Sequence, residues 1–197
     1  VAHWVAGLAG AESHVATPGP WVLPLIAGGA VFAVLWRGRL RWAGLAPLAA
    51  AFWLWGQTER PALLVADTGG LVGVMTDAGR ALSKPRGDGF SAEVWLENDG
   101  APKPQEAAHA LGAITRGTPA AVGRWQVVHV TGKRALAALE GCGGADVLVT
   151  NVTPELPLPC LTLDLSMLRD TGAVAAFTIG DKLRFVTAAE VTGMRPW

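Results

Sequence analysis

Two uncharged segments decide the fold expected for this sequence: WVLPLIAGGAVFAVLW at Trp21–Trp36 and WAGLAPLAAAFWLW at Trp42–Trp55. Tryptophans stand at the ends of both segments, as is typical of side chains at a membrane–water interface. Residues 20–36 number 17, which makes about 25 Å of α-helix against a hydrocarbon core of roughly 30 Å. We therefore expect a two-helix transmembrane hairpin, with helices at about 20–36 and 42–57. The alternative is a buried helical hairpin inside a soluble protein.

The basic segment between the two expected helices sets their orientation. Arg37, Arg39 and Arg41 fall within five residues, and such residues in a short loop mark its cytoplasmic side. We interpret the three arginines as topology anchors rather than as phosphate contacts. Both flanks of the hairpin then lie outside the cytoplasm. The expected organisation is a membrane segment over 1–57, in the inner membrane, and an extracytoplasmic, periplasmic domain over 58–197.

The sequence also suggests a longer polypeptide. The first residue is Val1 rather than methionine, and a lone membrane hairpin would leave the small residues Gly28 and Gly29 without a helix to pack against. We therefore expect further helices upstream of Val1, so that the rest of the polypeptide is itself a partner of this segment.

The residues after the hairpin have the composition of a globular domain. From Thr58 onward there are 13 Lys and Arg against 15 Asp and Glu, a net charge of −2. About 140 residues suffice for one domain with its own core. A slightly acidic domain is a poor candidate for tight, non-specific DNA binding, which needs many cations to neutralise phosphates.

Turn signals and apolar patterning predict a mixed α/β (α+β) fold for this domain. Residues 62–83 have the pattern of a three-stranded β-meander, and 90–96 that of a short helix. Residues 125–150 predict a strand, a helix and a second strand, and hence one parallel crossover. Two further strands are expected on either side of Gly180 and Asp181.

Cys142 and Cys160 are the only cysteines. In an extracytoplasmic compartment two thiols 18 residues apart can form a disulfide, worth about 3 kcal/mol in the loop-entropy account. The alternative is two small buried thiols. Spacing alone does not separate the two.

Asp67-Thr68-Gly69 and Asp170-Thr171-Gly172 repeat the tripeptide of aspartic proteases, in which two carboxylates share a proton. The second copy follows Arg169 in what is expected to be a helical turn rather than an apolar strand. Asp-Thr-Gly is also common turn chemistry. Asp67 is therefore kept only as a polar candidate.

The histidines do not form a metal-binding pattern. His3, His14, His109 and His129 are scattered, without a His-x-His pair or a Cys-x-x-Cys motif. His129 is retained as a candidate, although a histidine on a sheet surface is the simpler account. Lys133, in Thr131-Gly132-Lys133 before a helix, resembles the end of a phosphate loop whose earlier glycine is missing. We expect no catalytic residue, metal or cofactor.

Several segments together resemble the C-terminal region of ComEC competence proteins. They are RPALLVADTGGLVGVMTDAGRALS (60–83), FSAEVWLENDG (90–100), VVHVTGKRALAALEGCGGADVLVTN (127–151) and the final GMRPW (193–197). ComEC proteins are polytopic inner-membrane proteins that pass single-stranded DNA into the cytoplasm during natural transformation. The resemblance implies a DNA-uptake channel whose partners are single-stranded DNA, the membrane and other competence proteins.

Many ComEC proteins end in a metallo-β-lactamase-like domain, and this sequence departs from its motifs. The family's ligands are a His-x-His-x-Asp-His cluster, an aspartate after a Thr-Gly turn and a late histidine. Here Lys133 follows the Thr-Gly turn, and Asn151 follows the strand at Asp146–Thr150 in place of a histidine pair. The resemblance therefore implies a degenerate, metal-free relative that is not an enzyme.

The expected function is DNA translocation, with a non-catalytic periplasmic domain. Two alternatives stay open: a membrane-anchored hydrolase that uses Asp67 and Asp170 or a degenerate metal site near His129, and a purely structural periplasmic module.

Overall fold

The computed structural model describes residues 15–193 and divides the chain into two units, Val1–Glu59 and Arg60–Trp197. The division falls two residues after the expected boundary between 57 and 58. Val1, His3, His14 and the last four residues of the GMRPW segment lie outside the described residues. The two units are described separately.

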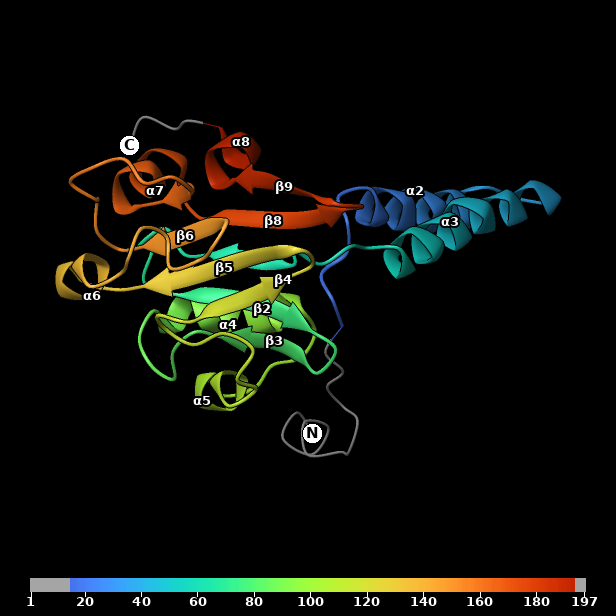
Figure 1. Cartoon of the computed structure of the whole chain (residues 1–197). Helices are drawn as coiled ribbons and strands as arrows, with labels where there is room; N and C mark the ends of the chain where they lie inside the picture. The colour runs from blue at the N-terminus through green and yellow to red at the C-terminus, as the bar shows by residue number, and fades with distance from the viewer. Residues whose placement is uncertain (1–14, 194–197) are drawn as a thin grey trace. The chain divides into compact units, whose positions relative to one another are not determined.

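The first unit contains two α-helices joined by a 3-10 helix (Figure 1): α2 (Val22–Leu35), η1 (Arg39–Gly44) and α3 (Leu45–Gly56). Glycines allow the two backbones to touch, since a Cβ added at Gly44 would lie 2.6 Å from the carbonyl oxygen of Gly29. The indole Nε1 of Trp55 donates a hydrogen bond to the carbonyl oxygen of Ala16, 2.8 Å away.

The prediction of a transmembrane hairpin is wrong. Helices α2 and α3 have 14 and 12 residues, about 21 and 18 Å long at 1.5 Å per residue. Within residues 15–193, no helix combines the length and the apolar character that a membrane crossing requires. The expected lengths failed because Trp36 leaves the helix in an extended conformation, and because residues 39–44 form η1 rather than the start of α3.

The arginines of the turn lose their assigned role with this correction. Arg37, Arg39 and Arg41 are exposed, and Arg41 lies over the ring of Trp42 with its guanidinium carbon 5.7 Å from the ring centroid. The orientation that they were expected to set depended on a membrane-spanning hairpin.

The second unit is a mixed α/β fold built on two sheets. The first sheet has five antiparallel strands in the order β3-β2-β1-β8-β9. Its first three strands are the expected meander, and its last two are the strands expected around Gly180. The bounds are β1 Leu63–Val65, β2 Val72–Thr76, β3 Gly79–Leu82, β8 Val174–Ile179 and β9 Lys182–Thr187.

The second sheet has four strands in the order β4-β5-β6-β7. Strands β5 and β6 are parallel and helix α6 lies between them in the chain, so the predicted crossover is confirmed. The antiparallel strand β4 and the second parallel pairing, β6 with β7, were not predicted. The bounds are β4 Pro119–Val122, β5 Trp125–Val130, α6 Lys133–Ala137, β6 Val147–Thr150 and β7 Leu161–Leu163.

The two sheets pack face to face around one apolar core, because alternate residues of each strand point to opposite faces. Leu63 and Val65 of β1 share this core with Val127 of β5 and Val147 of β6. Helices α4 (Gly89–Asn98) and α5 (Gln105–His109) cover the outer face of the first sheet.

Side chains from the α6 region cover the outer face of the second sheet. Helix α7 (Leu165–Thr171) adds Leu168 to the central core, and α8 (Ala188–Thr192) follows β9. The order of layers in the second unit is thus helix, sheet, sheet, helix (Figure 1).

A buried ion pair joins β3 to the end of α4. Arg80, 1% exposed, donates from Nε to Asp99 Oδ2 at 2.5 Å and from Nη2 to Oδ1 at 3.0 Å. The same Nη2 also donates to the carbonyl oxygen of Pro61 at 3.2 Å. The two-pronged geometry fixes both elements, and removing one partner of such a pair leaves an uncompensated buried charge.

Candidate functional site

The carboxyl ends of β5 and β6 meet at one corner of the sandwich because the two strands are parallel neighbours. Thr131-Gly132-Lys133 follows β5, and Asn151 follows β6. The amide N–H of Gly132 donates to the Asn151 side-chain oxygen at 2.8 Å. The positions at which the ComEC resemblance would put metal ligands therefore lie together, but they carry an ammonium group and a carboxamide.

The turn between β1 and β2 closes this corner from the first sheet. Gly69 has a φ of +63°, a left-handed conformation, and a Cβ added there would clash with the carbonyl oxygen of Thr150 and lie 2.9 Å from its carbonyl carbon. The same Cβ would stand 3.1 Å from the Cα of Asn151. Only glycine allows the turn to rest directly on the backbone of β6.

His129 is the buried polar side chain that ties the two sheets together at the corner. Its neighbours Val128 and Val130 point to the α6 side of the sheet, so His129 points inward, and it is 0% exposed. Its Nε2 lies 3.1 Å from the carbonyl oxygen of Gly69. Because a carbonyl can only accept, Nε2 carries the proton. The expectation of a histidine on the sheet surface is wrong.

The imidazole of His129 is held neutral. Burial lowers the pKa of His129 from its ordinary value of 6.5 to about 4, the hydrogen bond to Gly69 opposes that shift, and the charges of Lys84 and Arg116 reinforce it. Its Nδ1 is then a buried acceptor, and it has no hydrogen-bond partner among residues 15–193. A neutral ring bonded to a backbone carbonyl serves the packing of the two sheets.

A polar network continues from the turn to the start of α4. The hydroxyl of Thr68 donates to Asp88 Oδ1 at 3.0 Å and accepts from the N–H of Gly70 at 3.0 Å. The other oxygen of Asp88 pairs with Lys84. These contacts hold the loop before α4 to the β1–β2 turn. They do so although Asp88 has a φ of +51°, a left-handed conformation that costs a residue with a side chain some backbone strain. Both groups of the ion pair are thus engaged within the fold.

Of the predicted polar residues, Asp67 and Lys133 lie at the corner with His129, and Asp170 lies in α7. Asp67 is exposed in the β1–β2 turn, Asp170 is exposed in α7, and Lys133 is exposed at the start of α6. Over residues 15–193, no three side chains of His, Cys, Asp or Glu are grouped as metal ligands.

A disulfide lies on the outer face of the second sheet. It joins Cys142, which is 8% exposed, to Cys160, with the two Cα atoms 6.2 Å apart. Cys160 packs with Leu139 and Leu158 against the apolar cluster on that face. The bond ties the turn after α6 to the residue before β7.

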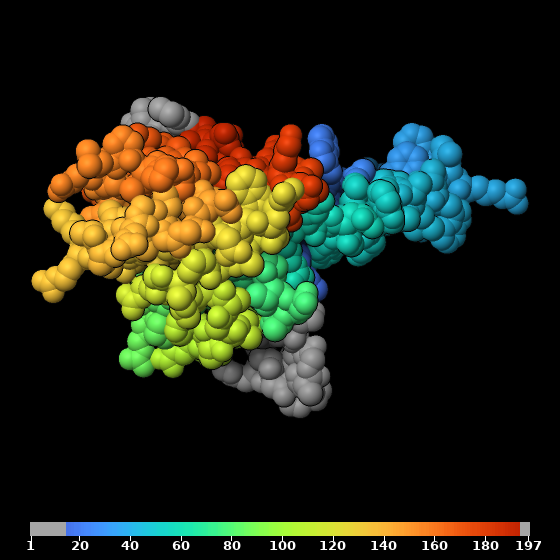
Figure 2. Space-filling view, viewed as in Figure 1, coloured from blue at the N-terminus to red at the C-terminus, as the bar shows by residue number. Residues whose placement is uncertain are grey.

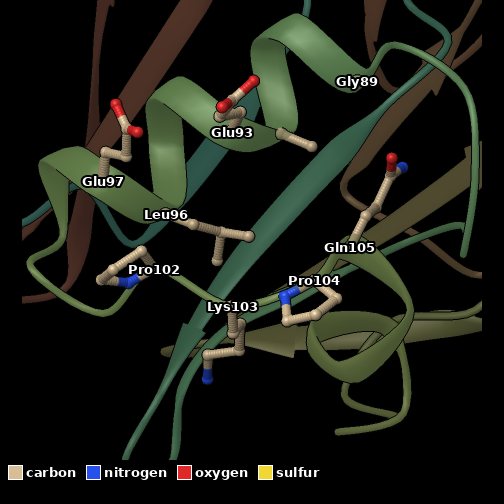
Figure 3. Close-up of a pocket in the computed structure, with 9 residues that line it drawn as sticks. Gly89, Glu93, Leu96, Glu97, Pro102, Lys103, Pro104 and Gln105 are labelled. Carbon is tan, nitrogen blue, oxygen red and sulfur yellow. The ribbon is translucent and has the colours of Figure 1, made fainter. Parts of the chain in front are cut away.

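Hollows open on the surface of the second unit at several places. One of about 440 Å³ lies beside Arg116 and Thr131, near the corner, and one of about 410 Å³ lies between α6 and the segment 152–158. Another, of about 380 Å³, lies between α4 and residues 102–105 (Figure 3). Figure 2 shows the segments from α6 to β7, gold to orange, and those around α5, yellow-green, on separate parts of the surface of this unit.

Sequence reasoning missed three contributors to the corner. Asn151 was noted as a departure from the ComEC pattern, but its bond to Gly132 needs the parallel pairing of β5 and β6. Gly69 and Asp88 gave only ordinary turn signals, and their contacts join segments far apart in the chain. No family model, curated protein or solved structure matches this chain.

Proposed function

We propose that this chain takes part in the uptake of single-stranded DNA during natural transformation, as a protein of the ComEC kind, and that its Arg60–Trp197 unit acts there without catalysing a reaction. The observation that carries the second half is the bond between Gly132 and Asn151 at 2.8 Å. It joins the two segments in which the resemblance would put metal ligands, and neither segment supplies a carboxylate or an imidazole.

The chemistry of the corner supports a non-catalytic role. A divalent metal in such a site needs deprotonated Cys, neutral His or carboxylate ligands. The Asn151 oxygen instead accepts from a backbone amide, and Lys133 adds a positive charge. The Nε2 of His129 is bonded to Gly69, and the backbone of Gly69 packs against that of Thr150 too closely for a ligand to lie between these two segments.

The disulfide supports an oxidising compartment for the second unit, because such bonds form and persist outside the reducing cytoplasm. The Cys142–Cys160 bond supports this location without reference to any membrane helix. A periplasmic location is therefore part of the proposal.

The test measures transformation frequency in the cell that carries this gene. Deleting the codons for residues 60–197 should sharply reduce the transformation frequency. The rest of the protein must stay at wild-type level, which immunoblotting checks. Unchanged transformation after the deletion would contradict a required role for this unit.

A second arm separates the non-catalytic unit from a hydrolase. The purified chain is incubated with single-stranded DNA in the presence of zinc, manganese or magnesium, and its metal content is measured. We expect no cleavage that depends on Asp67 or His129. Cleavage that is lost in Asp67→Asn, or one bound metal per chain that is lost in His129→Gln, would establish the hydrolase alternative instead.

A further inference from the structure

The groove between α4 and residues 102–105 has an apolar floor and an acidic rim. Its floor consists of Ala92 and Leu96, both 2% exposed and part of the apolar cluster under α4. Pro102 and Pro104 form the opposite wall. In Figure 3, the Leu96 side chain points from α4 toward the two prolines, so the space between them is apolar at its base.

Hydrogen bonds within the fold hold both walls of this groove in place. Asp99, which follows α4, is held by Arg80 through two hydrogen bonds. Gln105, at the far end of the opposite wall, donates to the carbonyl oxygens of Lys84 at 3.2 Å and Gly87 at 2.9 Å. A rigid groove loses less conformational entropy on binding.

The rim of the groove is acidic and its charge is not neutralised. Glu93 and Glu97 stand four residues apart on α4, both exposed, and neither makes an ion pair within residues 15–193. Like charges at this spacing weaken a helix by a few tenths of a kcal/mol. The one basic residue in the lining, Lys103, points its ammonium group away from α4 (Figure 3), toward the carbonyl oxygen of Ala78 at 3.5 Å.

An exposed aromatic side chain extends the same face of α4. Phe90 is 82% exposed, and it precedes Glu93 by three residues and Glu97 by seven, so the three share one face of the helix. An aromatic ring next to two carboxylates is suited to a cation that has an apolar stem. Phosphates would be repelled by the two carboxylates, which excludes a nucleic acid backbone as the ligand.

We propose that this groove binds a positively charged peptide segment of a partner protein. An arginine of the partner pairs with Glu93 and Glu97, its aliphatic stem lies over Leu96 between the α4 and Pro102–Pro104 walls, and Phe90 contacts its guanidinium plane. Arginine fits better than lysine because its planar group both pairs with carboxylates and stacks on aromatic rings. This inference is independent of the proposed function in DNA uptake.

The test selects binders from a random heptapeptide display library against the purified full chain and against its Glu93→Gln/Glu97→Gln variant. Peptides that contain arginine should be enriched on the wild-type chain and not on the variant. A synthetic copy of the most enriched peptide, measured by fluorescence anisotropy, should bind the variant at least about tenfold more weakly, which corresponds to 1.4 kcal/mol. Phe90→Ala should weaken binding about threefold or more.

Glu155→Gln is the matched control, because Glu155 is an exposed acid beside the separate hollow at 152–158. It should leave binding unchanged, and circular dichroism should show all variants folded. Selection without arginine enrichment, or equal enrichment on the double variant, would overturn the proposal. Dimers in sedimentation that disappear in Glu93→Gln/Glu97→Gln would also overturn it, by assigning the groove to a second copy of this chain.

Discussion

Two regions of the second unit use polar residues in opposite ways. At the corner formed by β1, β5 and β6, the Asn151 oxygen and the Nε2 of His129 bond to the backbone, and Gly69 packs directly against the backbone of Thr150. In the groove beside α4, Glu93 and Glu97 make no ion pair within residues 15–193, above an apolar floor. The polar groups of the corner thus stabilise the packing of the two sheets, whereas the two carboxylates of the groove have no ion-pair partner among the described residues.

The largest effect is expected from the ion pair behind the groove. Arg80→Ala should destabilise the chain by about 3–5 kcal/mol, because it leaves the carboxylate of Asp99 buried without a partner. Chemical denaturation followed by circular dichroism measures the change. Arg124→Ala is the control, since its pair with Asp181 is exposed and should contribute less than about 1 kcal/mol. Equal losses in the two variants would show that burial of the Arg80 pair is not what matters.

The close packing at the corner is tested by Gly69→Ala. We expect a loss of about 3–4 kcal/mol, in which left-handed strain and a clash with Thr150 both contribute. Gly180→Ala separates the two causes, because Gly180 has a φ of +57° but open space around its Cβ position. It should cost only about 1–2 kcal/mol. If Gly69→Ala were as stable as Gly180→Ala, the backbone of Thr150 would be able to accommodate a Cβ at position 69, and the close packing would not contribute to stability.

The neutral state of His129 predicts a dependence of stability on pH. Its pKa is lowered to about 4 in the folded chain, so the unfolded chain binds the proton first as the pH falls. The stability is therefore fully present above pH 6.5 and is lost between pH 6.5 and 4, by about 3 kcal/mol in total. The midpoint temperature of thermal unfolding should therefore change less with pH in His129→Leu than in wild type. His109→Gln is the control, and equal slopes in wild type and His129→Leu would contradict the account.

The smallest effect is expected in the groove. Glu93→Gln/Glu97→Gln removes a like-charge pair from α4 and should stabilise the chain by a few tenths of a kcal/mol. Chemical denaturation at low salt is the measurement, and the gain should fade as salt is added. A loss of more than about 1 kcal/mol would show that these carboxylates support the fold and are not free for a ligand.

Local patterns were enough to predict most of the strands in the second unit. The meander at 62–83 and the crossover at 125–150 were readable because alternating apolar residues and turn residues are close in sequence. Strand β4 was missed because it is short and begins at Pro119. The parallel pairing of β6 with β7 was missed because a proline-rich segment separates them and gives no signal of direction.

The remaining errors came from contacts between distant residues and from helix ends. The burial of His129 depends on Gly69, 60 residues earlier in the chain, so no local pattern could place it inside. The helices expected at 20–36 and 42–57 are present as Val22–Leu35 and Leu45–Gly56. Both are shorter than expected, because Trp36 is extended and residues 39–44 form η1. Hydropathy reports apolar content and does not report where a helix ends.

The most direct test of the proposal that the corner has no catalytic role is the transformation frequency of cells that carry Asp67→Asn together with Lys133→Ala. Both side chains are exposed at the corner, so their loss should leave the fold intact. The account predicts the frequency of wild-type cells, while Arg80→Ala falls to the level of the 60–197 deletion. A drop to that level in the Asp67→Asn/Lys133→Ala cells, with the protein at normal abundance, would contradict it.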